Sequence, residues 1–287
     1  MKKVGSILLV LVFLALLAVF VYSGWSLYSY FRESIQSKNT YSELESLLQP
    51  QPKLPTQLGG ETPDVSSDAT GGTEDVPAPD PYVTVTNPKT GEDISILAQF
   101  SALYELNPDL VGWIRIPGTN ISYPVVQSEE TKKDYYLRRD YYGKSDTHGC
   151  IYVREQCDVF APSDNCTIYG HRMKDGTMFA ELAYYEDKTF WEQHQYIEFN
   201  TLTELHTYQI LAVFITTSSV GEGFSYHQFV DAGDSSDFNR FISQCKALDL
   251  YETGISAQPG DKLITLSTCE YTQENGRLVV VAKRVSQ

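Results

Sequence analysis

Basic residues are scarce in this sequence of 287 residues. Lysine and arginine together number 22 against 37 aspartate and glutamate residues, which gives a formal net charge of −15 at pH 7. The imbalance persists in residues 81–287, which hold 28 acidic and 17 basic residues. Nucleic-acid phosphates favour a basic protein face, and so do anionic lipids. The shortage of positive charge therefore argues against nucleic-acid binding, and against adhesion of residues 81–287 to anionic lipid.

Charged residues are absent from Val4 to Phe31. Within this stretch, Ile7–Tyr22 is an unbroken apolar run. A helix of about 20 residues crosses a bilayer, so the stretch is long enough to span one. We therefore expect residues 1–31 to comprise two cytoplasmic lysines and a transmembrane anchor.

The orientation of this anchor follows from Lys2 and Lys3, which precede it. Positively charged flanks stay in the cytoplasm, so the rest of the chain is expected outside the cell after a single pass through the membrane. A cleaved signal peptide is the alternative, because Ser23 and Gly24 are small enough for a cleavage site. The length of the apolar stretch and its aromatic flank favour a retained anchor.

Closely spaced cysteine pairs are also missing. The five cysteines form no Cys-x-x-Cys pair and show no zinc-site spacing; they are Cys150, Cys157, Cys166, Cys245 and Cys269. Disulfides are allowed outside the cell, but an odd number leaves at least one thiol free within one chain. We expect four of the cysteines to pack in the core or to form one or two disulfides. The fifth needs a chemical explanation.

Large apolar residues nearly disappear between Pro50 and Pro81. The composition there is rich in Pro, Gly, Thr, Ser and Asp, which cannot bury a core and is typical of a flexible linker. Residues 32–49 predict a short helical stalk that leaves the membrane, so that stalk and linker together occupy residues 32–80. The linker is expected to give reach, and neither the anchor nor the linker is expected to contribute to the core. The folded domain then occupies residues 81–287 and should be soluble, monomeric and active without the preceding segments.

Short strand-like runs dominate this domain. One helix is predicted first, because apolar residues recur at helical spacing over Ile94–Leu110. A second helix is predicted over Ser236–Leu250, and its expected buried face consists of Phe238, Phe241, Ile242, Cys245 and Leu248. Eight strand-like runs are Gly112–Ile116, Ser122–Val126, Cys150–Val153, Thr167–Tyr169, Tyr196–Asn200, Glu204–Thr216, Lys262–Thr268 and Leu278–Val285. With the second helix between the late strands, they predict a mostly β domain that forms a closed or nearly closed barrel.

Three residues are candidates for chemistry. The run Leu263–Cys269 ends in a cysteine, and a strand end can fix the backbone of a nucleophile while its side chain faces a cleft. His171 can share a proton with such a thiol. Arg277 opens a valine-rich run and can hold the oxyanion that forms when a thiolate attacks a carbonyl. Each signal is weak alone, since a lone cysteine at a strand end is more often structural.

Together the three signals resemble the sortase family. Thr265-Leu-Ser-Thr-Cys269 matches its TLxTC signature, Tyr169-Gly-His171 matches the segment that bears its catalytic histidine, and Arg277 matches its arginine. Further likeness lies in Val111–Thr119, Tyr123–Gln127 and Gly176–Phe179, so that about residues 95–285 are covered. The late helix and the Thr-Cys-Glu sequence resemble class B in particular.

The resemblance implies an eight-stranded sortase-type β-barrel and a cysteine transpeptidase that attaches secreted proteins to the surface of a Gram-positive cell. Cys269 would cleave a C-terminal sorting motif after threonine, with His171 as acid and base and Arg277 at the substrate or oxyanion. The implied partners are surface proteins or pilins that bear the motif, and an amine of a peptidoglycan precursor or a pilin as acceptor. No cofactor and no metal are implied, calcium included.

Two other functions are open. Thr147-His-Gly-Cys150-Ile resembles the cysteine motif of L,D-transpeptidases, which crosslink peptidoglycan. No histidine precedes His148, however, and Tyr152 stands where that family has asparagine. An exported binding module without catalysis is the other alternative. The histidines besides His171 are expected to be surface or hydrogen-bonded residues; they are His148, His194, His206 and His227.

Overall fold

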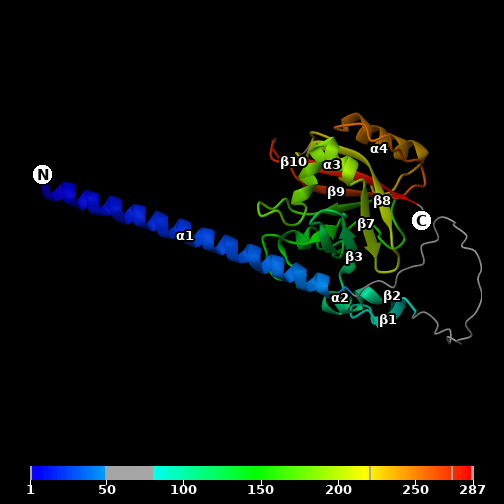
Figure 1. Ribbon diagram of the computed structural model, residues 1–287, viewed down its shortest axis with the longest axis horizontal. Helices are drawn as coiled ribbons and strands as arrows, with labels where there is room; N and C mark the ends of the chain where they lie inside the picture. The colour runs from blue at the N-terminus through cyan, green and yellow to red at the C-terminus, as the bar shows by residue number, and fades with distance from the viewer. Residues whose placement is uncertain (1, 49–79, 220, 273, 286–287) are drawn as a thin grey trace, which may run out of the picture.

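The computed structural model describes residues 2–48, 80–219, 221–272 and 274–285. The linker expected between the stalk and the domain lies outside the described residues. A long helix, α1, extends from a β-rich body, and a small hairpin lies beside the docked end of that helix (Figure 1). The body holds the candidate residues, and its strands decide where they meet.

Eight strands close into a barrel in the order β10-β8-β7-β3-β4-β5-β6-β9. They are β3 (Leu110–Arg115), β4 (Ser122–Val126), β5 (Ile151–Val153), β6 (Asn165–Tyr169), β7 (Tyr196–Thr201), β8 (Thr207–Thr217), β9 (Leu263–Cys269) and β10 (Gly276–Val285). The β4–β5 and β6–β9 pairs are parallel, and the other pairs are antiparallel. Each predicted run corresponds to one of these strands, so the eight-stranded barrel is confirmed.

The helix predicted over Ile94–Leu110 is only partly correct. Asp93–Leu97 forms strand β2, which pairs with β1 (Tyr82–Thr86) in a separate antiparallel hairpin. Helical backbone covers the 3-10 helix η1 (Ala98–Phe100) and α2 (Ser101–Leu106). The Asp-Ile-Ser-Ile sequence of β2 alternates polar and β-branched residues, which suits a strand. This period of two outweighs the helical spacing there.

Helix α4 (Ser235–Leu248) lies between β8 and β9 in the chain, as predicted. The Asp234 carboxylate accepts hydrogen bonds from the backbone N–H groups of Ser236 and Asp237, which caps the helix. Its buried side joins β8 and β10 in a hydrophobic cluster outside the barrel. Leu248, expected on that side, is instead 40% exposed. The remaining helices are α3 (Lys188–Gln193), η2 (Tyr135–Arg138), η3 (Ala180–Glu186) and η4 (Tyr226–Gln228).

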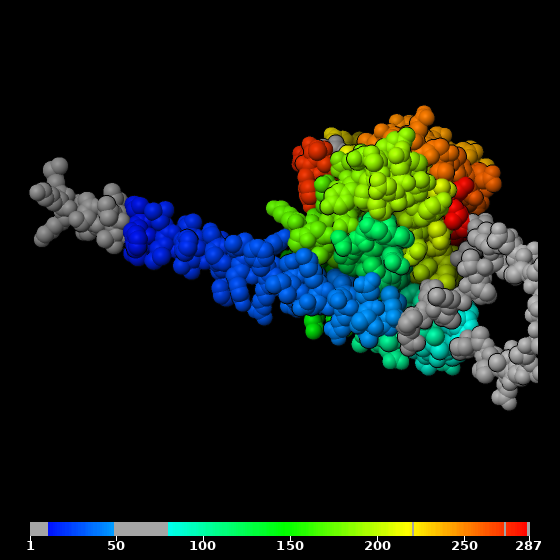
Figure 2. Space-filling model, viewed as in Figure 1, coloured from blue at the N-terminus to red at the C-terminus, as the bar shows by residue number. Residues whose placement is uncertain are grey.

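Helix α1 runs from Lys2 to Ser46 without a break. Its apolar part is long enough to cross a membrane and is exposed from Leu11 onward, whereas its C-terminal end packs against the body (Figure 2). Tyr41 and Leu44 are buried there, and the Tyr41 ring meets that of Tyr123 edge to face at 5.2 Å between centroids. The predicted stalk therefore also adds to the core, because its last turns present apolar side chains to the barrel.

Candidate active site

Strand register brings the three candidate residues to one end of the barrel. Tyr169 of β6 pairs in parallel with Ser267 of β9. His171 and Cys269 each lie two residues further along, so the two strands deliver them at the same edge. Arg277 of β10 is directly opposite Cys269 in the antiparallel β9–β10 ladder. Residues that are far apart in the sequence therefore converge.

A pocket of about 400 Å³ lies at this end of the barrel, and Cys269, His171 and Arg277 all line it. Its other lining residues are Lys133, Asp134, Leu137, Tyr152, Arg154, Glu155, Tyr169, Gly170, Ser218, Tyr226, His227, Ser267 and Thr268. Most of these side chains are polar. They can hydrogen-bond the carbonyl and amide groups of an extended peptide.

Cys269 is the last residue of β9 and is partly exposed, whereas the other four cysteines are buried. The backbone N–H of Glu270 donates to the carbonyl oxygen of Gly276 at 2.9 Å, which ties the chain to β10 directly after the thiol. A fixed backbone with an accessible thiol is what a cysteine nucleophile requires. Exposure thus favours the same cysteine as the sequence does.

One hydrogen bond fixes the ring of His171, since its Nε2 lies 2.7 Å from the carbonyl oxygen of Leu137. A carbonyl can only accept, so Nε2 carries a proton and, in the neutral ring, Nδ1 can accept another. Burial lowers the pKa of His171; the bond to Leu137 opposes this shift, while the positive charges of Arg138 and Arg277 add to it. The neutral imidazole is thus favoured, and it can take a proton from a thiol.

The residue before His171 must be glycine for a steric reason. A Cβ atom on Gly170 would lie 2.5 Å from Cδ1 of Ile151 and 2.6 Å from Cδ2 of Phe179, closer than carbon atoms approach in proteins. The Gly170 N–H also donates to the carbonyl oxygen of Ser267 at 3.2 Å, which extends the contact between β6 and β9. Only glycine allows the chain to pass this close just before the histidine.

Carbonyl groups of its own turn restrain the guanidinium of Arg277. Its Nη1 donates to the carbonyl oxygen of Gly276 at 2.8 Å and to that of Asn275 at 3.3 Å. The side chain still contributes to the pocket lining. A guanidinium that is restrained in advance can donate hydrogen bonds to a carbonyl or an oxyanion.

Sequence reasoning missed the contribution of η4, which supplies Tyr226 and His227 to the pocket. The Tyr226 hydroxyl lies 2.6 Å from Oγ of Ser267, so η4 is attached to β9 two residues before Cys269. His227 was expected to be a surface or hydrogen-bonded residue, and it lies on the pocket wall. Burial lowers the pKa of His227, and the charge of Arg154 lowers it further. The only sequence signal was a Tyr-His pair after a strand.

Cys150, the candidate nucleophile of the L,D-transpeptidase alternative, is 1% exposed and does not line the pocket. Burial raises the pKa of this thiol far above its usual value, although a hydrogen bond of 3.4 Å from the Tyr41 hydroxyl opposes the shift. A buried thiol of raised pKa is a poor nucleophile. All five cysteines are among the described residues, and none forms a disulfide.

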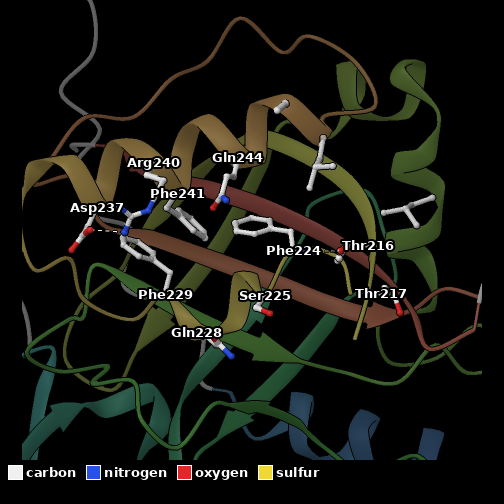
Figure 3. Close-up of a pocket in the computed structure, with 14 residues that line it drawn as sticks. Thr216, Thr217, Phe224, Ser225, Gln228, Phe229, Asp237, Arg240, Phe241 and Gln244 are labelled. Carbon is white, nitrogen blue, oxygen red and sulfur yellow. Dashed lines mark hydrogen bonds and ion pairs between the residues drawn. The ribbon is translucent and has the colours of Figure 1, made fainter. Parts of the chain in front are cut away.

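A larger cavity, of about 820 Å³, lies between α4 and β8 (Figure 3). The rings of Phe224, Phe229 and Phe241 line it, and an ion pair between Arg240 and Asp237 lies at one end. None of the three candidate residues lines this cavity. The chemistry of the lining residues, rather than size, therefore identifies the candidate active site.

Known proteins share this fold and this region of sequence. The family model of the sortase domain matches residues 114–285. Sortase B of Listeria monocytogenes is 34% identical over 187 residues, which cover 64% of this chain and 73% of that protein. Sortase B of Staphylococcus aureus is 32% identical over 187 residues, which cover 64% of this chain and 74% of that protein.

Solved structures of sortase B are also similar to this chain. The structure of sortase B from Bacillus anthracis in complex with AAEK1 has a TM-score of 0.66 at 27% identity and covers 90% of this chain and 100% of that one. The Staphylococcus aureus sortase B–substrate complex has a TM-score of 0.60 at 30% identity and covers 67% of this chain and 86% of that one. The chain therefore belongs to the sortase family of cysteine transpeptidases. Within that family, its relatives place it among the sortase B enzymes.

Proposed function

We propose that Cys269, His171 and Arg277 catalyse transpeptidation in the 400 Å³ pocket. The supporting observation is that a partly exposed thiol at the end of β9, an arginine of β10 and a histidine just after β6 line one pocket. Cys269, as thiolate, attacks the carbonyl carbon of the threonine in a C-terminal sorting motif. A thioester forms as the peptide C–N bond breaks, and the C-terminal fragment leaves as an amine.

His171 moves the protons of both half-reactions. It takes the thiol proton and, as imidazolium, gives a proton to the leaving amine. In the second half-reaction it accepts a proton from the incoming amine, which attacks the thioester and releases Cys269. Burial lowers the pKa of His171, which makes the imidazolium a stronger acid toward the leaving amine.

Arg277 stabilises the charge that develops during each attack. The former carbonyl oxygen becomes an oxyanion in the tetrahedral intermediate, and a donor that is already in place needs no reorganisation to meet it. The carbonyl groups of Gly276 and Asn275 provide that restraint for Arg277.

The acceptor is an amine of a cell-wall precursor or of a pilin. One related structure is the Staphylococcus aureus sortase B–substrate complex, and another is sortase B complexed with triglycine. A glycine peptide has a free N-terminal amine, which is the group that the second half-reaction needs. These complexes support a sorting-motif peptide and an amine as the two substrates of this chain as well.

The N-terminal part of α1 anchors the enzyme in the membrane, with Lys2 and Lys3 in the cytoplasm. The helix is continuous to Ser46, and its last turns are packed on the catalytic domain. The domain then lies outside the cell and close to the membrane surface. Proteins that leave the membrane with a C-terminal sorting motif would reach the pocket there.

A transfer assay tests this function. The enzyme is incubated with triglycine and an Asn-Pro-x-Thr-Asn peptide, a motif that class B sortases commonly recognise. Mass spectrometry should find the triglycine amine joined to the threonine carbonyl. Cys269→Ala should form no product while its circular dichroism stays native. Cys245→Ala, a change at a buried cysteine outside the pocket, should still form product. Cleavage at another bond, or product from Cys269→Ala, would contradict the proposal.

A further inference from the structure

The segment Thr147–Cys150, which the mechanism does not use, lies where two loops that hold His171 meet. The first, called the 137–150 loop, supplies the Leu137 carbonyl that accepts from Nε2 of His171 at 2.7 Å. The second, the 171–179 loop, begins at His171 and is closed by a hydrogen bond of 2.9 Å from the Phe179 N–H to the His171 carbonyl oxygen. One loop thus holds the ring and the other holds the backbone.

His148 joins the two loops. Its side chain is 1% exposed, with Nδ1 3.1 Å from Asp146 Oδ1 and Nε2 3.2 Å from Asp175 Oδ2. Asp146 belongs to the 137–150 loop, and Asp175 lies in the middle of the 171–179 loop. Burial lowers the pKa of His148, but the hydrogen bonds and charges of the two carboxylates outweigh burial and raise it. An imidazolium that donates from both nitrogens satisfies both carboxylates.

The 137–150 loop carries this restraint to the carbonyl that holds His171. The Asp146 N–H donates to the carbonyl oxygen of Arg138 at 3.1 Å. Gly149 has a φ of +60°, and a Cβ atom there would lie 2.5 Å from the carbonyl oxygen of Leu137. The backbone of the residue after His148 therefore passes close to the acceptor of the His171 hydrogen bond, with no room for a side chain between them.

Helix α1 is attached to both loops. Ser34 Oγ donates to Asp175 Oδ2 at 2.5 Å, on the same carboxylate oxygen that faces His148. The Tyr41 hydroxyl donates to the carbonyl oxygen of Gly149 at 2.7 Å. The end of the membrane helix thereby contacts the cluster formed by Asp146, His148 and Asp175.

We propose that His148 is a positioning residue for His171. Docking of α1 through Ser34 completes the cluster of Asp146, His148 and Asp175, and this cluster holds His148 in place. The proposal rests on the proposed role of His171 as acid and base. His148 does not line the pocket, so it acts through the two loops rather than on the substrate. Loss of the cluster leaves the pocket intact but lets the imidazole move, and a displacement of about 1 Å in a reacting group can cost roughly 10²-fold in rate.

Asp175→Asn is the most informative variant, because it keeps the shape of the side chain. Oδ1 can still accept from the N–H and hydroxyl of Thr177, which lie at 3.1 and 2.6 Å. The charge that faces His148 and Ser34 is lost. We expect kcat to fall about tenfold, as for loss of a hydrogen bond to a charged group, while KM for the sorting peptide changes less than about twofold.

The helix offers a matched pair of changes. Ser34 and Ser37 lie one turn apart on α1, and both are buried against the body. Ser34 Oγ bonds Asp175, whereas Ser37 Oγ has no hydrogen-bond partner among the described residues. Ser34→Ala should lower kcat about threefold, and Ser37→Ala should leave it unchanged.

The experiment uses the full chain in detergent micelles and adds long-range ¹H–¹⁵N spectra of the histidine rings. In the unmodified enzyme His171 should appear as a single tautomer with protonated Nε2, and Asp175→Asn should mix the two tautomers. An unchanged His171 signal with unchanged kcat overturns the proposal, as do equal losses for Ser34→Ala and Ser37→Ala. An altered His171 signal with unchanged kcat supports the positioning role and overturns the catalytic role of His171 instead.

Discussion

Arg277 lies directly opposite Cys269 across the β9–β10 ladder. Directly paired residues of antiparallel strands are about 5 Å apart and point to the same face of the sheet. The guanidinium and the thiol therefore share one face at one end of the barrel. This placement allows the roles that we propose, in which Arg277 donates to the substrate carbonyl that Cys269 attacks.

Arg277→Lys should lower kcat by roughly 10²-fold, by comparison with the removal of one oxyanion donor. Lysine keeps the charge but loses the planar fork. Arg284→Lys, in the same strand and outside the pocket, is the control and should cost almost nothing in rate. Steady-state kinetics and thermal melts of both variants are the measurements. Equal and small effects would remove the catalytic role, and a large loss of stability at Arg277 would indicate a structural role.

Gly170→Ala should impair both stability and activity, since the added Cβ overlaps Ile151 and Phe179. Overpacking of this kind costs about 1–3 kcal/mol in the free energy of unfolding, and the strain falls on the residue before His171. Adding Ile151→Val removes one of the overlapping methyl groups and should restore part of both losses. Urea unfolding and transfer rates measure the two effects. Native behaviour of Gly170→Ala would show that β6 and its neighbours pack more loosely than the 2.5 and 2.6 Å distances to Ile151 and Phe179 require.

The acidic side of the pH profile of kcat/KM should follow His171. In the proposed mechanism the neutral imidazole of His171 takes the thiol proton, so the rate falls when His171 is protonated at low pH. Burial lowers the pKa of His171 from its ordinary value of 6.5, so this fall should lie below that pH. The positive charge of Arg138 also lowers this pKa.

Replacing Arg138 tests the assignment. Loss of a positive charge favours the imidazolium, so Arg138→Gln should move the acidic fall toward higher pH. Arg115→Gln, at an ion pair with Glu198 outside the pocket, should leave the fall in place. A shift toward lower pH in Arg138→Gln would mean that another group controls this part of the profile.

Removing α1 should destabilise the domain. A chain that starts at residue 80 lacks Tyr41 and Leu44, which are buried against the body. Its free energy of unfolding should fall by at least about 2 kcal/mol, the contribution of one buried leucine, relative to a chain that starts at residue 32. Leu44→Ala in the longer chain should cost about 2–5 kcal/mol. Equal stability in urea for all three proteins would mean that α1 does not pack on the barrel in solution.

The barrel was predictable because each of its strands is a short run bounded by turn residues. The sequence pattern gave the wrong element over Ile94–Leu97, where the apolar residues fit both a period of two and a helical spacing. Only pairing with β1 makes this segment a strand. The burial of Tyr41 and Leu44 was not predictable either, because a stalk and a docked helix have the same local sequence pattern. Long-range packing selects between the two.

The part of the site that consists of side chains was predictable from the sequence. Family motifs singled out Cys269, His171 and Arg277, and the structure brings them to one pocket. The Leu137 carbonyl that holds the imidazole has no side-chain signature, so no sequence pattern could identify it. The bond from Tyr226 to Ser267 likewise depends on how η4 folds back on β9.

The thioacyl intermediate offers the most direct test of the nucleophile. The enzyme is mixed with a sorting-motif peptide without an acceptor amine, quenched in acid, digested and mapped by mass spectrometry. The acyl group is predicted on the fragment that contains Cys269, and Cys269→Ala should show no adduct. An adduct on Cys150 instead would support peptidoglycan crosslinking through the Thr147–Cys150 segment and would contradict the assignment of Cys269 as the nucleophile.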